Sequence, residues 1–437
     1  MSINYDIKDI KLAALGERKI AWVRDNMPLL RALEERYADL PKREKPLAGV
    51  RLSLSIHMEA KTAYLCRVLI WAGAQVSAMG CNVLSTQDDV AAALVRGRTA
   101  SQDKRDHGGR AVPGVGVFAI HGESEASYSK HVEMCLAHRP NIVIDDGGDL
   151  VGMLHSKRTD LAADVWGGGE ETTTGVIRLK ALEAAGKLNF PMVAVNDARC
   201  KHLFDNRYGT GQSVWDSILR NTNLIVASKT VVVAGYGWCG RGIAMRAAAL
   251  GAQVIITEID YVKAMEARMD GYSVMTMEQA AARGDIFITA TGCKDVITLA
   301  HMALMKDGAI LGNAGHFNVE IDMAGLAKKA KDRYVAKNNI ETYVLPRGKH
   351  INILAEGRLL NIAAADGHPA EIMDISFAVQ FYAALYVKQN HLTLENRVYD
   401  VSGEIDDVVS RARVAAWGVE IDSLTPAQEK YLKSWEL

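Results

Sequence analysis

The chain has 437 residues, of which 49% are hydrophobic and 24% are charged, a composition typical of globular proteins with two or three domains. Its 51 basic and 52 acidic side chains give a formal net charge of −1, which argues against nucleic-acid binding and against binding to membrane surfaces. The six cysteines are scattered, with no CxxC pair and no metal-ligand spacing, so no metal site is predicted.

The opening residues, MSINYDIKDI, lack the basic stretch and apolar core of a signal peptide. No run of about 18 apolar residues occurs, so no membrane-spanning helix is predicted. The expected location is therefore the cytoplasm.

Helical and strand patterns alternate through the first 230 residues. Residues 10–38 have helical periodicity with a break at Pro28, and the stretch 97–116, rich in glycine and charge, is predicted to be an exposed loop. The other helices predicted here are 59–71, one after the loop within EETTTGVIRLKALEAAGKL (170–188), and 214–220. The predicted strands are 50–56, 75–79, 141–144 and 190–197.

A second α/β unit is predicted in residues 229–350, followed by an amphipathic helix at 377–387 that is expected to return to the first unit. Strands that alternate with helices indicate mostly parallel sheets, which bind ligands at the carboxyl ends of their strands. The predicted fold class is therefore α/β, with two doubly wound domains and a small helical C-terminal segment.

The stretch 231–260, VVVAGYGWCGRGIAMRAAALGAQVIITEID, has the pattern of a dinucleotide-binding βαβ unit. Gly235, Gly237 and Gly240 fit G-x-G-x-x-G, which permits a tight turn, close approach to a pyrophosphate and close helix packing. Glu258 ends the next predicted strand, where a carboxylate binds ribose hydroxyls and repels a 2′-phosphate. The pattern therefore predicts bound NAD rather than NADP, the alternative being a glycine-rich turn without a ligand.

Further polar clusters are unusual for a simple dehydrogenase. These are SIHMEAKTA, DDGGDL, EETTTG, KHLFDNRYG, NAGHFNVEI and ADGHP. Lys201 and Asp205 are four residues apart and are expected on one face of a helix. Each cluster also has a structural interpretation, because threonines can cap a helix, a Lys–Asp pair can lie on the surface, and aspartates can end a strand.

The motifs STQDD, DDGGDL, EETTTGV, FDNRYG, VVAGYG, GHFNVEID and AEGRL followed by GHP stand in the order found in one enzyme family. On these motifs the chain resembles the S-adenosylhomocysteine hydrolase (adenosylhomocysteinase) family, in its short-chain archaeal and bacterial form. The resemblance runs from MPLL near residue 27 to LTPAQEKYL near residue 424.

The resemblance implies reversible hydrolysis of S-adenosyl-L-homocysteine to adenosine and L-homocysteine with tightly held NAD. Hydride leaves C3′ of the ribose, the C4′ proton becomes acidic, homocysteine is eliminated, water adds, and the hydride returns. The implied organisation is a substrate-binding domain (1–200, to which 367–400 returns), an NAD-binding Rossmann domain (210–366) and a C-terminal oligomerisation segment (401–437). A homotetramer is implied as well.

The resemblance also assigns roles to individual residues. Lys201 and Asp205 match a pair that binds the ribose hydroxyls and assists deprotonation at O3′, whereas His57 and Asp146 match groups that transfer protons at C4′ and C5′. The implied substrate-binding residues are Glu59, Lys61, Cys81, Asn82, Glu171, Asn196, His316 and His368. The implied cofactor-binding residues are Thr172, Thr173, Thr174, Asn206, Gly235, Gly237, Gly240, Glu258, Thr291 and Asn361. A buried structural thiol explains Cys81 equally well.

The chain departs from the common long-chain members at three places. Glu59 and Lys61 stand where those members have threonine and a glutamate that accepts the exocyclic amine of adenine. Because a lysine can only donate, it would suit the carbonyl of hypoxanthine, unless it pairs with Glu59 or another acid at the pocket rim. S-inosyl-L-homocysteine therefore remains an alternative substrate. The chain also stops short of the tail that reaches the NAD of a neighbouring subunit, and the 97–116 loop is longer than expected.

Two other classes of function compete with this interpretation. A conventional NAD dehydrogenase would release NADH, whereas the closed cycle of the family releases none. An NAD-binding regulatory protein is expected to lack Lys201, Asp205 or Asp146, and the sequence retains all three.

Overall fold

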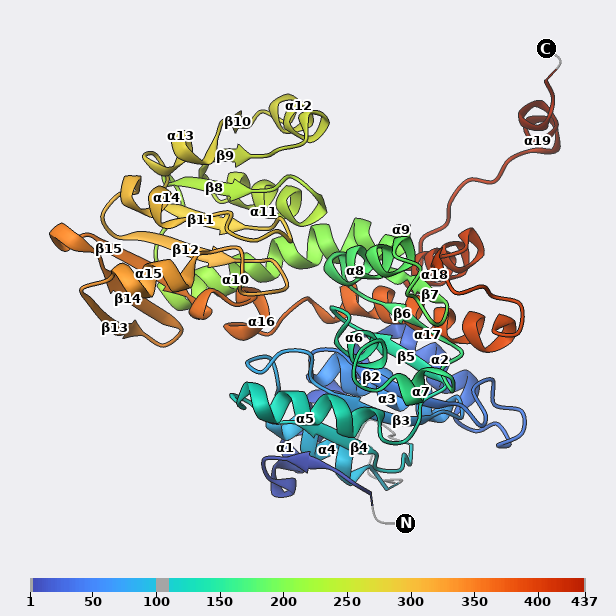
Figure 1. Ribbon diagram of the computed structural model, residues 1–437. Helices are drawn as coiled ribbons and strands as arrows, with labels where there is room; N and C mark the ends of the chain where they lie inside the picture. Colours follow the sequence, from blue (N-terminus) through green and yellow to red (C-terminus); the bar gives the residue numbers. More distant parts are fainter. Residues whose placement is uncertain (1–2, 100–109, 436–437) are drawn as a thin grey trace.

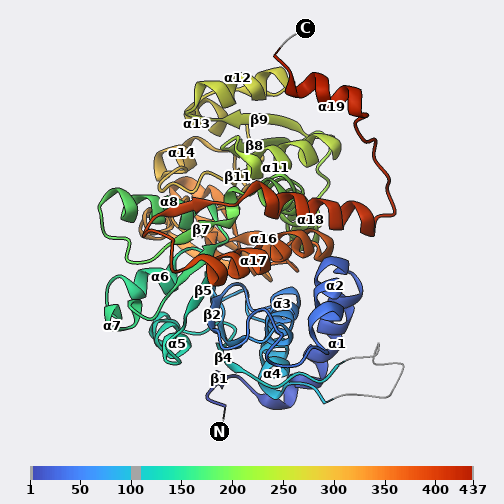
Figure 2. The same cartoon turned by 90° about the vertical axis from the view of Figure 1, so that its right-hand side faces the viewer.

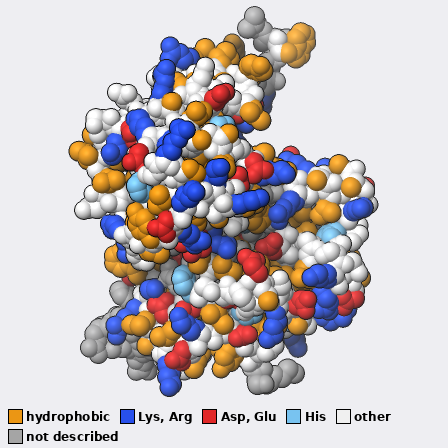
Figure 3. All heavy atoms as spheres, turned by 60° about the vertical axis from the view of Figure 1, so that its left-hand side comes forward, with side chains coloured by type: hydrophobic (Ala, Val, Ile, Leu, Met, Phe, Trp, Pro, Cys, Tyr) orange, Lys and Arg blue, Asp and Glu red, His pale blue; other side chains and the backbone are white. Residues whose placement is uncertain are grey.

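The computed structural model describes residues 3–99 and 110–435 and contains two α/β lobes, each built around an eight-stranded sheet (Figure 1). Basic and acidic side chains are interspersed over the face seen in Figure 3, in keeping with the near-zero net charge.

The first sheet has the order β1-β4-β3-β2-β5-β6-β7-β16, and all its neighbouring strands run parallel. Its strands are β1 (Asp6–Ile7), β2 (Arg51–Ser55), β3 (Gln75–Met79), β4 (Gly116–Ala119), β5 (Ile142–Asp145), β6 (Gly167–Glu170), β7 (Met192–Ala194) and β16 (Val398–Asp400). The sequence pattern predicted β2, β3, β5 and β7 but not the other four.

Helices cover both faces of this sheet. They are α1 (Ala13–Asp25), α2 (Pro28–Tyr37), α3 (Ala60–Trp71), α4 (Asp88–Arg96), α5 (Glu125–Leu136), α6 (Asp149–Leu154), α7 (Thr159–Ala162), α8 (Thr173–Ala184) and α9 (Arg199–Lys201). The predicted break at Pro28 is found between α1 and α2, because proline is accepted in the first turn of the second helix.

The described ends of the stretch 97–116, residues 97–99 and 110–116, are less exposed than the sequence suggested. Arg98 and Val112 form a β-bridge, and Val112 and Val115 are buried against the first lobe. The Trp71 indole donates a hydrogen bond to the carbonyl of Ala111. Residues 100–109 lie outside the described part of the chain, so the expected exposed loop is untested there.

The second sheet has the order β10-β9-β8-β11-β12-β15-β14-β13 and is parallel up to β15, with an antiparallel edge at β14 and β13. Its strands are β8 (Thr230–Ala234), β9 (Gln253–Thr257), β10 (Ser273–Val274), β11 (Ile286–Thr289), β12 (Ala309–Asn313), β13 (Asp332–Lys337), β14 (Ile340–Val344) and β15 (His350–Leu354). The strand order reverses next to β8, which is where doubly wound sheets bind nucleotides.

The helices of the second lobe are α10 (Thr210–Thr222), α11 (Trp238–Ala249), α12 (Tyr261–Met269), α13 (Met277–Ala281), α14 (Leu299–Leu304), α15 (Met323–Lys329) and α16 (Leu360–Ala363). A π-helix, η4 (His202–Gly209), leads from α9 into α10 and contacts both α17 and α11. Lys201 and Asp205 lie on one helical face as expected, with their charged atoms 3.6 Å apart, and the turn after Lys201 is π-helical.

The chain returns to the first lobe through α17 (Ala370–Asn390), which packs on α2, α3, β5 and β6 near the middle of the molecule (Figure 2). The sequence predicted an amphipathic helix over 377–387, but the structure buries most sides of a longer helix. Among the described helices α17 alone is long and apolar enough to cross a membrane, and 72% of its apolar window is buried inside the protein, as in a core helix.

The C-terminal segment consists of two helices with different surroundings. The helix α18 (Gly403–Ala416) packs on α17 and α2, and its Arg413 guanidinium lies 3.4 Å from Asp374. The helix α19 (Pro426–Lys433) has no buried residue and stands away from both lobes (Figure 1).

Strand β6 has the unusual sequence Gly-Gly-Gly-Glu because neighbouring groups approach its backbone closely. A Cβ added at Gly168 would lie 2.5 Å from the Val143 carbonyl oxygen and 2.9 Å from the Met192 sulfur. One added at Gly169 would lie 2.6 Å from Gln380 Oε1 on α17. Glycine therefore lets β6 pair with β5 and β7 while α17 lies against it.

We expect Gly168→Ala to lower the free energy of unfolding by about 1–3 kcal/mol, since the backbone of Val143 cannot move aside as a flexible side chain can. Urea unfolding followed by circular dichroism measures this change. Gly152→Ala is the matched control, because Gly152 is exposed in α6 and has no atom near its added Cβ. An unchanged midpoint in Gly168→Ala would contradict the packing argument.

Candidate active site

A cavity of about 1000 Å³ lies between the lobes, at the carboxyl ends of strands from both sheets. His57 follows β2, Asp146 follows β5 and Glu171 follows β6, while Gly235 follows β8. The predicted site residues that line this cavity are His57, Glu59, Lys61, Asp146, Glu171, Thr172, Thr173, Thr174, Asn196, Lys201, Asp205, Asn206, Gly235, Gly237, Glu258, Thr291, His316, Asn361 and His368. Cys81, Asn82 and Gly240 do not line the cavity.

The Lys201 ammonium is buried at the centre of a polar cluster. It donates to Asn206 Oδ1 at 2.8 Å and to Asn196 Oδ1 at 3.5 Å. Glu171 Oε1 lies 3.7 Å away and Asp205 Oδ2 lies 3.6 Å away. Burial lowers the pKa of Lys201, but Asp205 and Glu171 outweigh it, so the pKa is raised and the side chain is a cation.

The Asp205 carboxylate joins this cluster to α17 and to the 367–368 turn. Its Oδ1 lies 2.6 Å from His368 Nδ1, and its Oδ2 accepts a hydrogen bond from Ser376 at 2.7 Å. Burial raises its pKa, but Lys201 and His368 outweigh that effect and hold the pKa well below its usual range. Asp205 is therefore a permanent anion that fixes Lys201 and His368.

The pKa of Glu171 shifts in the opposite direction to that of Asp205. Its Oε2 accepts a hydrogen bond from the Gln380 amide at 2.6 Å, and its Oε1 has no hydrogen-bond partner among the described residues. Burial raises the pKa of Glu171 to about 8, although Lys201 opposes the shift. Oε1 is thus a buried polar atom on the cavity wall that can exchange a hydrogen bond with a bound hydroxyl.

His57 is held in one tautomer. The Ser85 hydroxyl donates to the Asn82 carbonyl at 2.9 Å, so it can only accept from His57 Nδ1–H at 2.8 Å. The Nε2 lone pair therefore faces Asp146 Oδ2, 3.5 Å away. Burial lowers the pKa of His57 to about 4, which leaves the imidazole neutral and able to accept a proton at Nε2.

Asp146 is contacted from two other sides. The Cys81 thiol donates to its Oδ2 at 3.3 Å, and His316 Nδ1 from the second lobe lies 3.8 Å from its Oδ1. Burial and Asp146 raise the pKa of the Cys81 thiol well above its usual value. Cys81 therefore supports Asp146 from behind the wall, and Asn82 completes the turn that holds Ser85.

The purine end of the predicted substrate site contains an ion pair. Lys61 Nζ lies 3.1 Å from Glu59 Oε2 and donates to the Asp366 carbonyl at 3.0 Å. The same Glu59 carboxylate caps α3 by accepting from the Lys61 amide. Lys61 thus pairs with Glu59 while both side chains line the cavity.

The glycine loop fits a dinucleotide. Gly235 has φ of +95°, and a Cβ at Gly240 would lie 1.9 Å from the Gly235 carbonyl oxygen, so both positions require glycine. The loop ends at the N-terminus of α11, which favours phosphate groups. The Glu258 carboxylate accepts from the Tyr236, Ile259 and Asp260 amides, which orients it at the cavity edge.

Other residues that could hold a dinucleotide reach the cavity from both lobes. Asn361 donates to Ser213, and its Oδ1 is a buried acceptor without a partner among the described residues. Thr291 donates its hydroxyl to Glu320 at 2.7 Å. The buried acceptor and the glycine cradle together fit an amide-bearing dinucleotide such as NAD.

Sequence reasoning missed several residues that position this site. Gln380 and Ser376 on α17 hold Glu171 and Asp205, and Glu320 holds the Thr291 turn. Asp145 and Glu170 are fully buried partners across β5 and β6. Glu170 lies next to predicted residues in EETTTG, and Asp145 lies next to them in DDGGDL, so these two motifs contained a signal for both. No local sequence pattern marks Ser376 or Gln380 on α17.

Asp145 and Glu170 shape the two loops that carry Asp146 and Glu171. Asp145 accepts from the amides of Asp146 and Val151, whereas Glu170 accepts from the amides of Gly147 and Thr172. Burial, with Asp149 next, raises the pKa of Asp145 to about 8, and burial together with Asp145 raises that of Glu170. The folded protein therefore keeps a proton on this pair near neutral pH.

The fold and the cavity define a dinucleotide-binding α/β enzyme. Residues 4–165 match the family model S-adenosyl-L-homocysteine hydrolase, and residues 206–367 match the model for the NAD binding domain of that enzyme. The chain therefore belongs to the S-adenosyl-L-homocysteine hydrolase family, is a hydrolase, and uses NAD as its cofactor.

Full-length relatives agree with this assignment. The chain is 52% identical to S-inosyl-L-homocysteine hydrolase of Methanocaldococcus jannaschii over 99% of each chain. It is also 52% identical to adenosylhomocysteinase of Thermococcus kodakarensis, over 99% of this chain and 98% of the relative. Its identity to adenosylhomocysteinase of Thermotoga maritima is 52% as well, over 96% of this chain and 99% of the relative.

The buried acid pair predicts how stability changes with pH. The pKa of Asp145 is higher in the folded chain than in the unfolded chain. Asp145 therefore contributes its full stabilisation of the folded protein below about pH 4, and this stabilisation is lost as pH rises toward about 8. In Glu170→Gln one acid is removed, so the loss of thermal stability between about pH 5 and about pH 9 should be smaller than in the wild type. Differential scanning calorimetry across this range measures it.

Glu133→Gln is the control, since Glu133 is exposed on α5. It should retain the pH dependence of the wild type. An identical pH dependence in Glu170→Gln would show that Asp145 and Glu170 do not share a proton in the folded protein.

Proposed function

We propose that the protein catalyses the reversible hydrolysis of S-adenosyl-L-homocysteine to adenosine and L-homocysteine. The observation that carries the proposal is the shared cavity. The glycine loop from the second lobe and the Lys201 cluster from the first lobe line the same space, together with His57 and Asp146.

Lys201, Asp205 and Glu171 are proposed to act on the ribose hydroxyls. Asp205 holds the ammonium in place, and the cationic Lys201 stabilises negative charge that develops at O3′. Glu171 Oε1 exchanges a hydrogen bond with a neighbouring hydroxyl, because it is buried and, apart from its ion pair with Lys201, accepts no hydrogen bond from the described residues. NAD, when bound, supplies the reversible removal of hydride from C3′.

His57 and Asp146 are proposed to move protons at C4′ and C5′. His57 Nε2 is an acceptor that faces the cavity, since Ser85 takes the proton-bearing Nδ1. Asp146 is held by the Cys81 thiol and approached by His316, so it keeps a fixed position beside Nε2. The pair therefore offers two neighbouring proton acceptors on the cavity wall.

S-inosyl-L-homocysteine is the second candidate substrate, and one relative at 52% identity carries that name. The Lys61 ammonium lies on the cavity wall, where it could donate to a purine O6. Its present partners, Glu59 and the Asp366 carbonyl, support the competing explanation that Lys61 only shapes the rim.

We further propose that the chain forms a homotetramer in the cytoplasm. The exposed apolar side chains that follow α18 support an association surface, which includes Ile421, Leu424, Tyr431, Leu432 and Trp435. Sedimentation velocity measures the oligomeric state, and cell fractionation measures the location; a monomer or a membrane-bound protein would contradict these proposals.

Lys201→Met should retain the fold and the bound NAD but lose about 10²–10⁴-fold in turnover, because charge at O3′ is no longer stabilised. Turnover is measured by homocysteine release, and NAD by extraction from the purified protein. Lys180→Met is the control, since Lys180 is half-exposed in a pair with Asp197. Near-normal turnover in Lys201→Met would overturn the role of Lys201.

The substrate base is tested by kcat/KM for S-adenosyl- and S-inosyl-L-homocysteine, measured side by side on the wild type and on Lys61→Glu. If Lys61 donates to the base, Lys61→Glu should shift the ratio toward the adenosyl substrate by about tenfold or more, as expected for one unpaired buried polar group. Equal ratios in the two proteins would show that Lys61 does not contact the base.

A further inference from the structure

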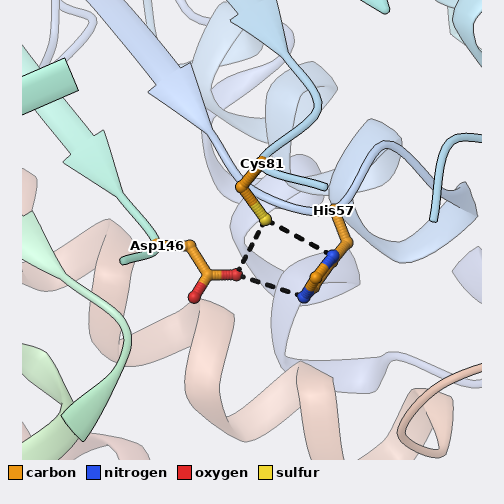
Figure 4. Close-up of side chains that lie close together, drawn as sticks. All are labelled: His57, Cys81 and Asp146. Atoms are coloured by element: carbon orange, nitrogen blue, oxygen red, sulfur yellow. Dashed lines mark hydrogen bonds and ion pairs between the residues drawn. The ribbon is translucent and has the colours of Figure 1, made fainter. Parts of the chain in front are cut away.

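Three potential metal ligands meet at the wall of the cavity. Cys81 Sγ lies 3.3 Å from His57 Nδ1 and 3.3 Å from Asp146 Oδ2, and His57 Nε2 lies 3.5 Å from the same oxygen (Figure 4). One ligand atom from each residue lies within 4.8 Å of the others, and all three residues are buried.

The fold explains why these ligands converge. His57, Cys81 and Asp146 follow β2, β3 and β5, which are adjacent parallel strands whose carboxyl ends meet at one edge. The residues are 24 and 65 positions apart along the chain, so the sequence contains no short metal-ligand spacing. The site therefore arises from sheet topology and could not be found from motif spacing.

Two of the separations, from Cys81 Sγ to Asp146 Oδ2 at 3.3 Å and from that oxygen to His57 Nε2 at 3.5 Å, match those that a tetrahedral ion requires. Zinc binds sulfur at about 2.3 Å and nitrogen or oxygen at about 2.0–2.2 Å, which places neighbouring ligand atoms about 3.3–3.6 Å apart. Thiolate, imidazole and carboxylate are also the ligand types that zinc and cobalt share. The cluster therefore combines suitable ligand types with ligand atoms that all lie within 4.8 Å of one another.

The hydrogen bonds around His57 prepare it as a ligand. Ser85 accepts from Nδ1–H, which leaves the Nε2 lone pair directed at Asp146. Two acceptors thus face each other at 3.5 Å, an arrangement that a cation between them would satisfy. A hydrogen bond from the second ring nitrogen is the usual support of a metal-binding histidine.

We propose that His57, Cys81 and Asp146 form an inhibitory binding site for a thiophilic divalent cation such as Zn²⁺. His57 and Asp146 line the cavity, so the ion enters from it and keeps one coordination position open toward the substrate. The thiol proton now donated to Asp146 leaves to solvent when the thiolate binds the metal. The bound ion occupies both proton-transfer groups and stops turnover.

The inhibition rests on the proposed function, whereas the binding does not, and the test separates the two. Co²⁺ is titrated into the full chain with its NAD, and the near-ultraviolet thiolate-to-cobalt band is recorded. We expect one Co²⁺ per chain, displaced by Zn²⁺. Cys81→Ser should lose the band. Ser85→Ala should bind about 10–100-fold more weakly, as expected when the support of a histidine ligand is removed.

Cys293→Ser is the matched control, because Cys293 is an exposed thiol that could itself bind metal. It should keep the band. A band that survives in Cys81→Ser, a band lost in Cys293→Ser, or no band at all overturns the site.

Zn²⁺ should inhibit wild-type turnover at concentrations that displace Co²⁺. Binding at Cys81 without inhibition would retain the site and overturn the proton-transfer role of His57 and Asp146.

Discussion

The burial of the Lys201 ammonium is the constraint on which the site depends. A charge taken out of water is costly unless opposite charges and hydrogen-bond acceptors surround it. Here the compensation comes from four segments: the turn after β7, the loop after β6, the π-helix and, through the partners of Asp205 and Glu171, α17. The polar cluster on the first-lobe wall of the cavity is therefore organised around one cation.

The π-helix allows the buried Lys201 charge to be compensated by two neighbouring side chains. Its wider turn stacks residue i+5 as well as i+4 near residue i, so Lys201 reaches Asn206 and Asp205 together. The two carboxylates beside the ammonium then separate in acidity, with the pKa of Asp205 held low and that of Glu171 raised to about 8. Such a separation assigns them different tasks, one as a fixed counter-ion and the other as a group that exchanges a proton.

Much of this organisation could be predicted from the sequence, because hydrophobic periodicity and the glycine loop indicate local secondary structure. The strands β2, β3 and β5 and the break at Pro28 follow from such patterns. Strand β6 was missed because three glycines carry no strand preference, and the need for glycine there comes from the close approach of Val143 and Gln380, which are distant in sequence. Helix α17 was taken as amphipathic because sequence alone does not reveal that structure covers its remaining sides. Ser376 and Gln380 carry no motif, and only the tertiary contact gives them a role.

The convergence of side chains at the carboxyl edge of a parallel sheet has a chemical consequence beyond catalysis. Proton transfer at carbon requires acceptors that are close together, desolvated and held in one tautomer, as His57 and Asp146 are. The same properties describe a preorganised metal site, and the Cys81 thiol behind the wall supplies the soft third ligand. Metal sensitivity would thus follow from preorganisation itself, because the geometry that holds His57 and Asp146 ready for a proton also holds them ready for a cation.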